Sequence, residues 1–421
     1  MKSIISAKPK EKFGLLGEKL SHSYSPLVHN CFGDYDYELF ETNKSGLEAF
    51  YADTSLKGFN VTIPYKVSAY EKCDFLSDTA KRTGSVNTCL RDSSNRLHGY
   101  NTDYYGFEKL LEHNNIVVTG KKVTVLGTGG AAKTVCCVLN DRGAKEIVNV
   151  SRSGDINYSS LEKFSDSDIL VNCTPVGMYP DITGKIISLD PFTRLEAVID
   201  LIYNPQLTPL LIDAKERGIT AVNGLIMLLY QAAASSRLFT GKKIKQETVI
   251  AAIGIIANSL TNIILVGMPG CGKTTVASTL EKALRKMFRA VDTDEAVLRA
   301  HGAAPEEIIK EQGEEKFREY EEEAVEKLCG EHGLVISTGG GAILSEKNRR
   351  LFRANGIVVF LQRDIDKLEI AGRPLSRDRM NLYKLYEERL PYYKMCADLV
   401  VEVDDNPAVT AERILECLSR L

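Results

Sequence analysis

Short apolar runs alternate with amphipathic segments along most of the chain, most regularly after residue 121. Each run is long enough for one strand, and the runs lie at 122–127, 146–152, 168–174 and 196–203. Between the first two, residues 131–144 place apolar side chains at helical spacing. Strands separated by a helix of this length are typical of parallel βαβ units. This part of the chain is therefore predicted to be an α/β fold with a parallel sheet.

The same alternation begins again at residues 262–267, with almost no linker before it. A helical segment at 224–237 and a second helix precede it, whereas the first hundred residues mix short β-rich runs with helical stretches. At 421 residues the chain is too long for a single typical core. We therefore predict two α/β parts that are joined near residues 259–262.

Composition narrows the class of protein. Hydrophobic residues make up 44% of the chain and charged residues 26%, which is ordinary for a globular protein, and the net charge of -3 gives no electrostatic reason to expect nucleic acid. No stretch approaches the ~18 consecutive apolar residues of a membrane span, and the N-terminus lacks a signal-peptide pattern. We expect a cytoplasmic protein whose partners are small molecules, not nucleic acid or membrane. The oligomeric state is left open.

The ten cysteines are scattered, without a CxxC pair or a matching histidine spacing. Cys136 and Cys137 are adjacent on a predicted helix, and Cys271 lies inside a glycine-rich loop. This pattern indicates free thiols rather than a disulfide framework or a zinc site.

Residues 267–274 have the spacing Gly-x4-Gly-Lys-Thr between a predicted strand and a predicted helix. In such a loop the glycines let backbone N–H groups turn toward phosphates, the lysine meets the β- and γ-phosphate oxygens, and the hydroxyl binds Mg²⁺. The motif predicts an ATP site formed by Gly267, Gly270, Gly272, Lys273, Thr274 and Thr275.

A pair of carboxylates, Asp292 and Asp294, ends the next predicted strand. Residues two apart on an extended strand point to the same face. One carboxylate can hold Mg²⁺ through water while the other contacts the phosphate acceptor.

Together with "GEEKFREYE", "VISTGGGAI", "GRPLSRD" and "YEERLPYYKMCADLVVE", these motifs resemble the shikimate kinase family over residues 262–421. The resemblance implies that Asp294 binds the ring hydroxyls of shikimate and assists deprotonation of the attacking one. It also implies that Asp292, with Thr274, serves Mg²⁺.

The same resemblance implies further residues around the kinase substrate. Arg318 and Arg389 would pair with the substrate carboxylate, as bidentate guanidinium geometry favours. Gly340 and Gly341 would bring backbone amides against the substrate. Arg373 would come from a lid onto the transferring phosphates.

A second glycine-rich turn stands after a predicted strand and opens a helix, as a dinucleotide-binding loop requires; it consists of Gly127, Gly129, Gly130 and Ala131. The next strand ends without an acidic residue, in Ser151, Arg152 and Ser153. An acidic residue there would bind a ribose 2′-hydroxyl, whereas an arginine between serines suits a 2′-phosphate. The pattern therefore favours NADP(H) over NAD.

Four motifs that precede this turn, "LSHSYSPLVHN", "NVTIPYK", "GSVNTC" and "GYNTDYYGF", resemble the shikimate dehydrogenase family. The later "NCTPVGMYP", "DLIYNP" and "NGLIMLLYQAA" extend the resemblance over residues 12–258. It implies that Ser23 and Ser25 bind the substrate carboxylate, and that Thr62, Asn87 and Gln231 bind ring hydroxyls.

The resemblance also implies that Lys66 and Asp103 form the catalytic pair at the reacting 3-position. Reduction of a ketone builds an alkoxide, so a proton donor must lie beside the oxygen. The spacing leaves open which of the two residues delivers the proton.

The predicted fold is α/β throughout. We expect an α/β substrate-binding domain at 1–107 that is completed by helices in 225–260, and a Rossmann NADP-binding domain at 108–224. A P-loop kinase domain with a parallel sheet flanked by helices would follow at 261–421.

The predicted function is bifunctional, with NADPH-dependent reduction of 3-dehydroshikimate to shikimate and then ATP-dependent phosphorylation of the 3-hydroxyl. In one alternative, one part has lost its chemistry and only binds ligand or positions its partner. In another, the chain is an NAD-dependent quinate/shikimate dehydrogenase or carries a gluconate-type kinase. A silent part has no chemical need for the full set of Lys66, Asp103, Lys273, Asp294, Arg318 and Arg389, which favours two active enzymes.

Overall fold

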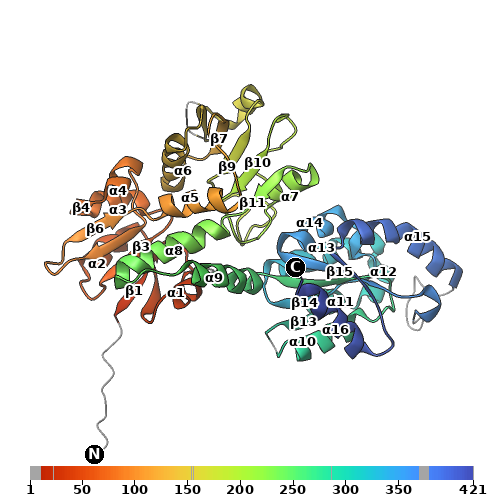
Figure 1. Cartoon of the computed structure of the whole chain (residues 1–421). Helices are drawn as coiled ribbons and strands as arrows, with labels where there is room; N and C mark the ends of the chain where they lie inside the picture. The colour runs from red at the N-terminus through yellow and green to blue at the C-terminus, as the bar shows by residue number, and fades with distance from the viewer. Residues whose placement is uncertain are drawn as a thin grey trace, which may run out of the picture. The chain divides into compact units, whose positions relative to one another are not determined.

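The computed structural model describes residues 11–21, 23–152, 154, 156–285, 287–368 and 379–420, with the backbone alone at 379. The chain forms two compact units (Figure 1). Unit 1 comprises Met1–Val176, Lys185–Tyr203 and Asp213–Ala257, and unit 2 comprises Gly177–Gly184, Asn204–Ile212 and Asn258–Leu421. The domain boundaries expected from the sequence stay a prediction.

Unit 1 begins with a six-stranded mixed sheet, here called sheet A, in the order β2-β1-β3-β5-β6-β4. Its strands are β1 (Lys12–Gly17), β2 (Asp36–Glu41), β3 (Gly58–Val61), β4 (Phe75–Leu76), β5 (Thr88–Arg91) and β6 (Leu97–Tyr100). β5 runs antiparallel to its neighbours β3 and β6, and all other pairs are parallel.

One face of sheet A is covered by three short helices, α2 (Leu47–Ala52), α3 (Lys66–Lys72) and α4 (Asp78–Thr83). Phe59 and Val61 of β3 are buried in the same apolar cluster as Ala69 of α3 and Ala80 of α4. The two strand residues share this face because strand side chains alternate between faces.

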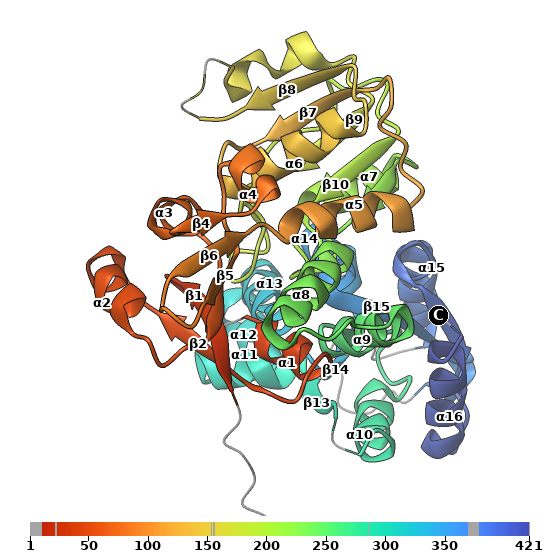
Figure 2. The same cartoon turned by 60° about the vertical axis from the view of Figure 1, so that its left-hand side comes forward.

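The other face of sheet A packs against α8 (Leu225–Thr240), which arrives from much later in the chain. The rings of Phe13 in β1 and Phe239 in α8 are stacked with centroids 4.4 Å apart. Three more helices belong to this part of the chain, namely α1 (Ser25–Asn30), α5 (Asp103–His113) and α9 (Gln246–Ser259). α5 lies along α8 (Figure 2).

The second sheet of unit 1, sheet B, is parallel throughout and has the order β11-β10-β9-β7-β8. Its strands are β7 (Lys122–Leu126), β8 (Glu146–Val150), β9 (Ile169–Asn172), β10 (Ala197–Asp200) and β11 (Thr220–Val222). α6 (Gly130–Asp141) follows β7, and α7 (Pro209–Glu216) precedes β11, with its first four residues in unit 2. β9 and β10 are buried along their whole length, as is usual for strands of a parallel sheet with covered faces. The predicted parallel α/β fold is confirmed here.

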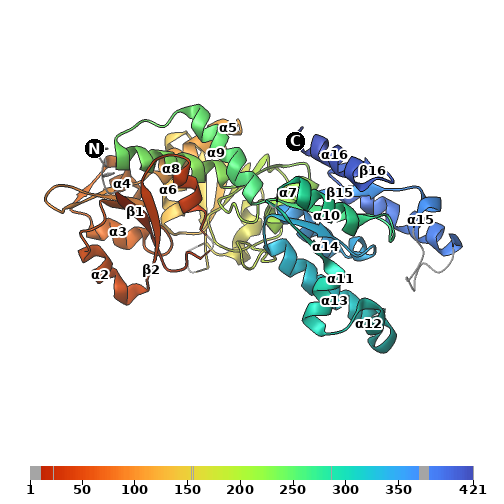
Figure 3. The same cartoon turned by 90° about the horizontal axis from the view of Figure 1, so that it is seen from below.

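Unit 2 contains a five-stranded parallel sheet, sheet C, in the order β13-β14-β12-β15-β16. Its strands are β12 (Asn262–Val266), β13 (Arg289–Asp292), β14 (Leu334–Ser337), β15 (Gly356–Gln362) and β16 (Leu399–Glu402). Its helices are α10 (Lys273–Ala283), α11 (Thr293–His301), α12 (Pro305–Gln312), α13 (Glu314–Gly330), α14 (Glu346–Asn355), α15 (Arg379–Cys396) and α16 (Pro407–Leu418). α10 packs against α16, and α13 packs against α14 (Figure 3). The predicted parallel sheet flanked by helices is therefore present.

Each parallel sheet places its first strand in the interior. β7 lies between β8 and β9, and β12 lies between β14 and β15. The chain thus leaves these strands toward one side of the sheet and later returns on the other side. Loops diverge at the carboxyl end of such a strand and leave a crevice. Both glycine-rich turns begin at such a crevice.

Two segments from the middle of the chain pack within unit 2. Leu207 N donates a hydrogen bond to Ala354 O at 2.9 Å, and Gln206 N donates to Asn355 Oδ1 at 2.8 Å. Ile182 is buried in the core of this unit. The core around sheet C is therefore not built from one continuous stretch of sequence.

All ten cysteines are free thiols. In the described part of the chain, no helix combines the length and the apolar character that crossing a membrane would require.

We predict that Phe239→Ala destabilises unit 1 selectively, because it removes a buried ring that joins α8 to sheet A. The expected loss is about 3–5 kcal/mol of unfolding free energy. Hydrogen exchange read by mass spectrometry should show faster exchange in β1, β3 and α8 and unchanged exchange in β12 and β14. Ile250→Ala on α9, where the side chain is 51% exposed, is the control and should change little. Equal effects of the two substitutions would contradict this account of the core.

Candidate active sites

One edge of sheet A gathers the predicted residues of unit 1. β1 and β3 are parallel and pair Leu16 with Val61, so both strands end at this edge. β5 starts there and β6 ends there, because Thr88 pairs with Tyr100 in antiparallel register. The segments that carry Ser23, Ser25, Thr62, Lys66, Asn87 and Asp103 all adjoin these strand ends.

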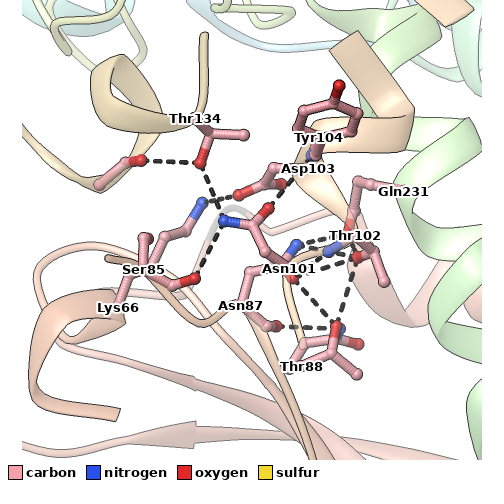
Figure 4. Close-up of polar contacts among 12 residues, drawn as sticks. Lys66, Ser85, Asn87, Thr88, Asn101, Thr102, Asp103, Tyr104, Thr134 and Gln231 are labelled. Atoms are coloured by element: carbon pink, nitrogen blue, oxygen red, sulfur yellow. Dashed lines mark hydrogen bonds and ion pairs between the residues drawn. The ribbon is translucent and has the colours of Figure 1, made fainter. Parts of the chain in front are cut away.

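Lys66 and Asp103 form an ion pair at this edge (Figure 4). Lys66 Nζ lies 2.6 Å from Asp103 Oδ2, and the side chains are only 15% and 7% exposed. Each residue opens a helix, α3 for the lysine and α5 for the aspartate. A lysine and a carboxylate held at this distance can exchange a proton with an oxygen placed beside them.

Asn87 and Gln231 meet through Thr102. The amide of Asn87 donates to Thr102 Oγ1 at 2.9 Å and to Gln231 Oε1 at 3.4 Å, while its Oδ1 accepts from Thr102 N at 2.7 Å (Figure 4). Gln231 reaches this place from α8. The structure thus brings together two of the three predicted hydroxyl ligands, with Thr102 as a member that the sequence analysis missed.

A buried polar layer lies beneath these side chains. Ser235 Oγ is 2.8 Å from the amide nitrogen of Asn60, 3.0 Å from Thr88 Oγ1 and 3.1 Å from Thr102 Oγ1. These residues lie on separate elements, so their spacing in the sequence carries no sign of the cluster. Such a satisfied network restricts the side chains above it.

Ser23 and Ser25 bond to each other, with 3.1 Å between their hydroxyl oxygens. Ser25 N also donates to Ser23 Oγ at 3.2 Å. Thr62 follows β3, and its backbone N donates to Leu16 O in β1 at 2.9 Å. These residues share the edge of sheet A with Lys66, but no described contact joins them to the Lys66–Asp103 pair.

The turn after β7 has the shape of a phosphate-binding loop. Gly127 has a φ of 110°, which an L side chain rarely adopts. A Cβ on Gly129 would meet no atom within 4 Å, so the space before α6 is open. The first amides of α6, at Gly130 and Ala131, lack partners in their own helix and can receive an anion. These residues fit the pyrophosphate of a dinucleotide.

Gly130 also lies close to Lys66 and Ser85. A Cβ at this position would lie 2.6 Å from Ser85 Oγ and 3.1 Å from Lys66 Cβ. Only a glycine lets the loop approach the lysine so closely.

The three residues predicted to bind a 2′-phosphate fall after β8. Arg152 is exposed, whereas Ser151 is buried, and its hydroxyl finds no hydrogen-bond partner among the described residues. Ser153 lies outside the described residues. The charged member of the set is therefore on the surface, where an anion could reach it.

The glycine-rich loop of unit 2 joins β12 to α10. Gly267, Gly270 and Gly272 have φ values of 152°, 80° and 99°. The Lys273 ammonium donates to the carbonyl oxygens of Gly267 at 2.9 Å and Met268 at 3.0 Å, so it lies within the loop. Three left-handed glycines and an enclosed ammonium fit a polyphosphate.

The predicted Mg²⁺ residues meet directly, since Thr274 Oγ1 donates to Asp292 Oδ2 at 2.9 Å. Ser337 at the end of β14 joins them, with its hydroxyl 3.1 Å from that of Thr274. Hydroxyl and carboxylate oxygens are ligands that Mg²⁺ accepts, so these residues fit the ion. Ser337 was not among the predicted residues, although it lies in the motif "VISTGGGAI".

The geometry expected for Asp292 and Asp294 was wrong. They do not share one face of a strand, because β13 ends at Asp292 and α11 begins at Thr293. Asp292 Oδ1 caps this helix by accepting from Asp294 N at 2.9 Å. A side chain that caps a helix ends the strand before it. Asp294 therefore projects from the first turn of α11.

Most of the residues predicted for the site of unit 2 line one cavity of about 300 Å³. Apart from Gly267, the predicted residues that the structure describes in unit 2 all line it: Gly270, Gly272, Lys273, Thr274, Thr275, Asp292, Asp294, Arg318, Gly340, Gly341 and Arg389. Arg373 lies outside the described residues.

Arg318 is held by two carboxylates on α13. Its guanidinium donates to Glu321 Oε2 at 2.7 Å and to Glu314 Oε1 at 2.9 Å. Burial raises the pKa of Glu321, and the charge of Arg318 opposes that shift. Burial lowers the pKa of Arg318, but the neighbouring carboxylates outweigh it and the net shift is upward. Glu321 was not among the predicted residues, although its place three residues after Arg318 on a helix indicates the pair.

Three consecutive glycines after β14 pack against different parts of the cavity. A Cβ on Gly339 would collide with Glu321, and one on Gly341 would collide with Arg318. A Cβ on Gly340 would lie 2.6 Å from Pro269 of the phosphate loop. Gly340 O also accepts from the hydroxyl of Tyr393 in α15, one turn after the buried Arg389. The sequence analysis missed Gly339.

Comparison with known proteins identifies both parts. Residues 15–89 match the family model "Shikimate dehydrogenase substrate binding domain". A shikimate dehydrogenase (NADP(+)) of Clostridium beijerinckii is 42% identical over 248 residues, which cover 54% of this chain and 92% of that protein. The chain belongs to the shikimate dehydrogenase family. Residues 269–419 match the family model "Shikimate kinase", so the chain also carries a shikimate kinase domain.

Solved structures agree with the dehydrogenase assignment. Shikimate dehydrogenase 1 of Peptoclostridium difficile has a TM-score of 0.56 and 35% identity, covering 58% of this chain and 97% of that one. The enzyme of Thermus thermophilus in complex with NADP(H) and shikimate has a TM-score of 0.53 and 31% identity, covering 58% and 99%. A chorismate mutase/shikimate 5-dehydrogenase fusion protein of Clostridium acetobutylicum has a TM-score of 0.55 and 35% identity, covering 59% of this chain and 97% of that one.

We predict that Gly130→Ala lowers the stability of unit 1 without any ligand, because the added methyl group collides with Ser85 Oγ. Overpacking of this kind costs about 1–3 kcal/mol. Thermal unfolding should show the loss, and Ser85→Ala in the same chain should restore part of it. Gly129→Ala is the control, since its methyl group would enter open space. An unchanged melting temperature for Gly130→Ala would refute the close approach of the loop.

We predict that Glu321→Gln raises the KM of the kinase reaction for shikimate by at least ~10-fold, because the Arg318 guanidinium loses a buried charged partner. Glu314→Gln removes the more exposed partner of the same arginine and should change KM by less than ~3-fold. Steady-state kinetics of both variants test this difference. The dehydrogenase activity of the same chain serves as the internal measure of correct folding. Equal KM values for the two variants would contradict the role of burial.

Proposed function

We propose that the two units catalyse consecutive reactions on one carbon skeleton. Unit 1 reduces 3-dehydroshikimate to shikimate with NADPH, and unit 2 phosphorylates the 3-hydroxyl of shikimate with ATP and Mg²⁺. The main support for the proposal is one observation. In each unit the residues that the chemistry needs converge beside a glycine-rich loop at the end of an interior strand.

In unit 1, bound NADPH supplies a hydride. The reduction builds negative charge on the keto oxygen, and the Lys66–Asp103 pair at 2.6 Å supplies the proton that neutralises it. Contact between Lys66 and Gly130 keeps the pair next to the dinucleotide loop. Ser23 and Ser25 bind the substrate carboxylate in this proposal.

The ring hydroxyls of the substrate are assigned to Thr62, Asn87 and Gln231. Asn87 and Gln231 already share hydrogen bonds through Thr102, so a hydroxyl placed between them finds both donors and acceptors. Arg152, exposed after β8 where no acidic residue stands, supports NADP(H) as the dinucleotide.

In unit 2, Thr274 and Asp292 would hold Mg²⁺, which neutralises charge on the phosphates of bound ATP. The Lys273 ammonium now bonds to two loop carbonyls, and phosphate oxygens offer it stronger, charged acceptors. Asp294 accepts the proton of the attacking 3-hydroxyl.

The kinase substrate is assigned to the remaining wall of the cavity. Arg318 and Arg389 bind its carboxylate, and the amides of Gly340 and Gly341 contact it. Arg389 is 4% exposed, and its Nε finds no hydrogen-bond partner among the described residues. A buried guanidinium with spare donor capacity favours an anionic ligand.

The alternative of one silent part finds little support in this arrangement. The ion pair of unit 1 and the cavity of unit 2 each hold the polar groups that their reaction requires. A part that only bound ligand would have no use for the Lys66–Asp103 pair or for a hydroxyl and a carboxylate at 2.9 Å.

A coupled assay with 3-dehydroshikimate, NADPH and MgATP tests the proposal. The full chain should oxidise NADPH and form ADP and phosphorylated shikimate. Lys66→Ala should slow NADPH oxidation by at least ~100-fold while phosphorylation of added shikimate continues. Lys273→Ala should do the reverse, because the phosphate loop loses its ammonium.

Lys72→Ala on α3 and Lys282→Ala on α10 are matched controls on the same helices, and both should retain the two activities. NADPH oxidation without any phosphorylated product would eliminate the kinase half of the proposal. Retention of both activities by Lys66→Ala and Lys273→Ala would eliminate the site assignment.

A further inference from the structure

Asn101 lies where the part of unit 1 built on sheet A meets the part built on sheet B (Figure 4). The side chain is 6% exposed. Its amide nitrogen lies 2.9 Å from Thr83 Oγ1 and 3.0 Å from Ser85 O, which belong to the sheet A part. The same nitrogen lies 2.9 Å from Thr134 Oγ1 in α6, which belongs to the sheet B part.

Thr134 accepts one hydrogen bond and donates another. The Thr134 hydroxyl donates to Gly130 O at 3.0 Å, so its oxygen is left to accept from Asn101. Thr134 is 0% exposed, so bulk solvent does not reach this bond. The chain of donors therefore leads from Asn101 to the glycine that opens α6.

The side-chain oxygen of Asn101 bonds to α5, the helix that begins with Asp103. Asn101 Oδ1 accepts from Tyr104 N at 3.1 Å, in the first turn of α5. That turn begins with Asp103, the partner of Lys66. One buried amide thus bonds to the helix that carries the carboxylate and to the helix that carries the dinucleotide loop.

The hydrogen bond and ion pairs that join the carboxyl end of α6 to the sheet A part are more exposed than the Asn101–Thr134 bond. Asp141 at the end of α6 accepts from the hydroxyl of Tyr104 at 2.6 Å and pairs with Arg82, whose side chain is 51% exposed. Arg142 pairs with Glu108 at 2.9 Å, with side chains 37% and 25% exposed. Exposed ion pairs hold geometry weakly, so the buried Asn101–Thr134 bond is the stiffer connection near the loop.

We propose that Asn101 is a positioning residue that, through Thr134, couples occupancy of the dinucleotide loop to the geometry of the Lys66–Asp103 pair. The inference rests on the proposed function of unit 1. A dinucleotide that settles on the first turn of α6 fixes Gly130 and Thr134, and Asn101 passes this constraint to the first turn of α5. Cofactor and shikimate then bind cooperatively, and the coupling is the same in both directions.

The coupling can be measured on the full chain without turnover. NADPH and shikimate do not react with each other, and without ATP the kinase is idle. NADPH is titrated by its fluorescence, with and without saturating shikimate. Since NADPH binds only unit 1 in the proposed function, the signal reports that site even though shikimate also binds unit 2.

Shikimate should tighten NADPH binding to the wild-type chain by at least ~5-fold. We call the Kd of NADPH without shikimate, divided by its Kd with shikimate, the coupling ratio. Thr134→Val keeps the shape of the side chain but removes the acceptor for Asn101, so its coupling ratio should fall to within ~2-fold of unity. Thr134→Ser keeps the hydroxyl and should keep the coupling. Thr124→Val is the matched control, because Thr124 is also 0% exposed and its hydroxyl bonds to Ser167 at 2.8 Å, within the sheet B part.

Loss of coupling in Thr134→Val alone supports the inference. A coupling ratio near unity in the wild-type chain would overturn the inference. An unchanged coupling ratio in Thr134→Val would overturn it too, and both results would leave the proposed function intact. Equal loss in Thr124→Val would overturn it as well, since any buried hydroxyl of sheet B would then suffice. Failure of the wild-type chain to bind NADPH would overturn the proposed function and this inference with it.

Discussion

Each parallel sheet adds its later strands first on one side of an interior strand and then on the other, and the sites of this protein depend on this change of side. After β7 the chain adds β8 on one side and later β9 on the other. After β12 it adds β13 and β14 on one side and later β15 on the other. Loops that depart to opposite sides cannot fill the space above the strand. The glycine-rich loops after β7 and β12 lie at such spaces. Each loop leads into a helix, and the first backbone amides of that helix face the space.

The two loops meet this constraint with different chemistry. The loop after β7, at residues 127–129, carries no charged side chain, and Gly130 after it lies close to Lys66. The loop after β12 encloses the Lys273 ammonium with three glycines of positive φ. A pyrophosphate that remains intact needs only positioning, whereas a phosphate that is transferred needs charge beside it.

Buried polar contacts restrict side chains at or beside the predicted sites in both units. Asn101 and Ser235 bond to side chains from several elements in unit 1, and Glu321 holds Arg318 in unit 2. Such contacts contribute modestly to net stability, but an unsatisfied buried polar group is costly. A different arrangement of these side chains would leave some of the buried polar groups without a hydrogen bond. The side chains at the sites are therefore held in one arrangement.

The sequence by itself determined the α/β class, the parallel sheets and the two loops, because strand periodicity, glycine spacing and flanking elements are local properties. It also indicated the Lys66–Asp103 pair, the Thr274–Asp292 pair and the arginines of the kinase cavity through motif resemblance. It did not reveal the hydrogen bonds that Thr102 makes with Asn87 and Gln231, that Ser337 makes with Thr274 and that Asn101 makes with Thr134, or the close approach of Gly339 to Glu321. It was wrong about the shared face of Asp292 and Asp294, since a helix begins between them. Only the tertiary structure decided these points, because each depends on contact between elements that lie far apart in the chain, or on a cap that competes with strand continuation.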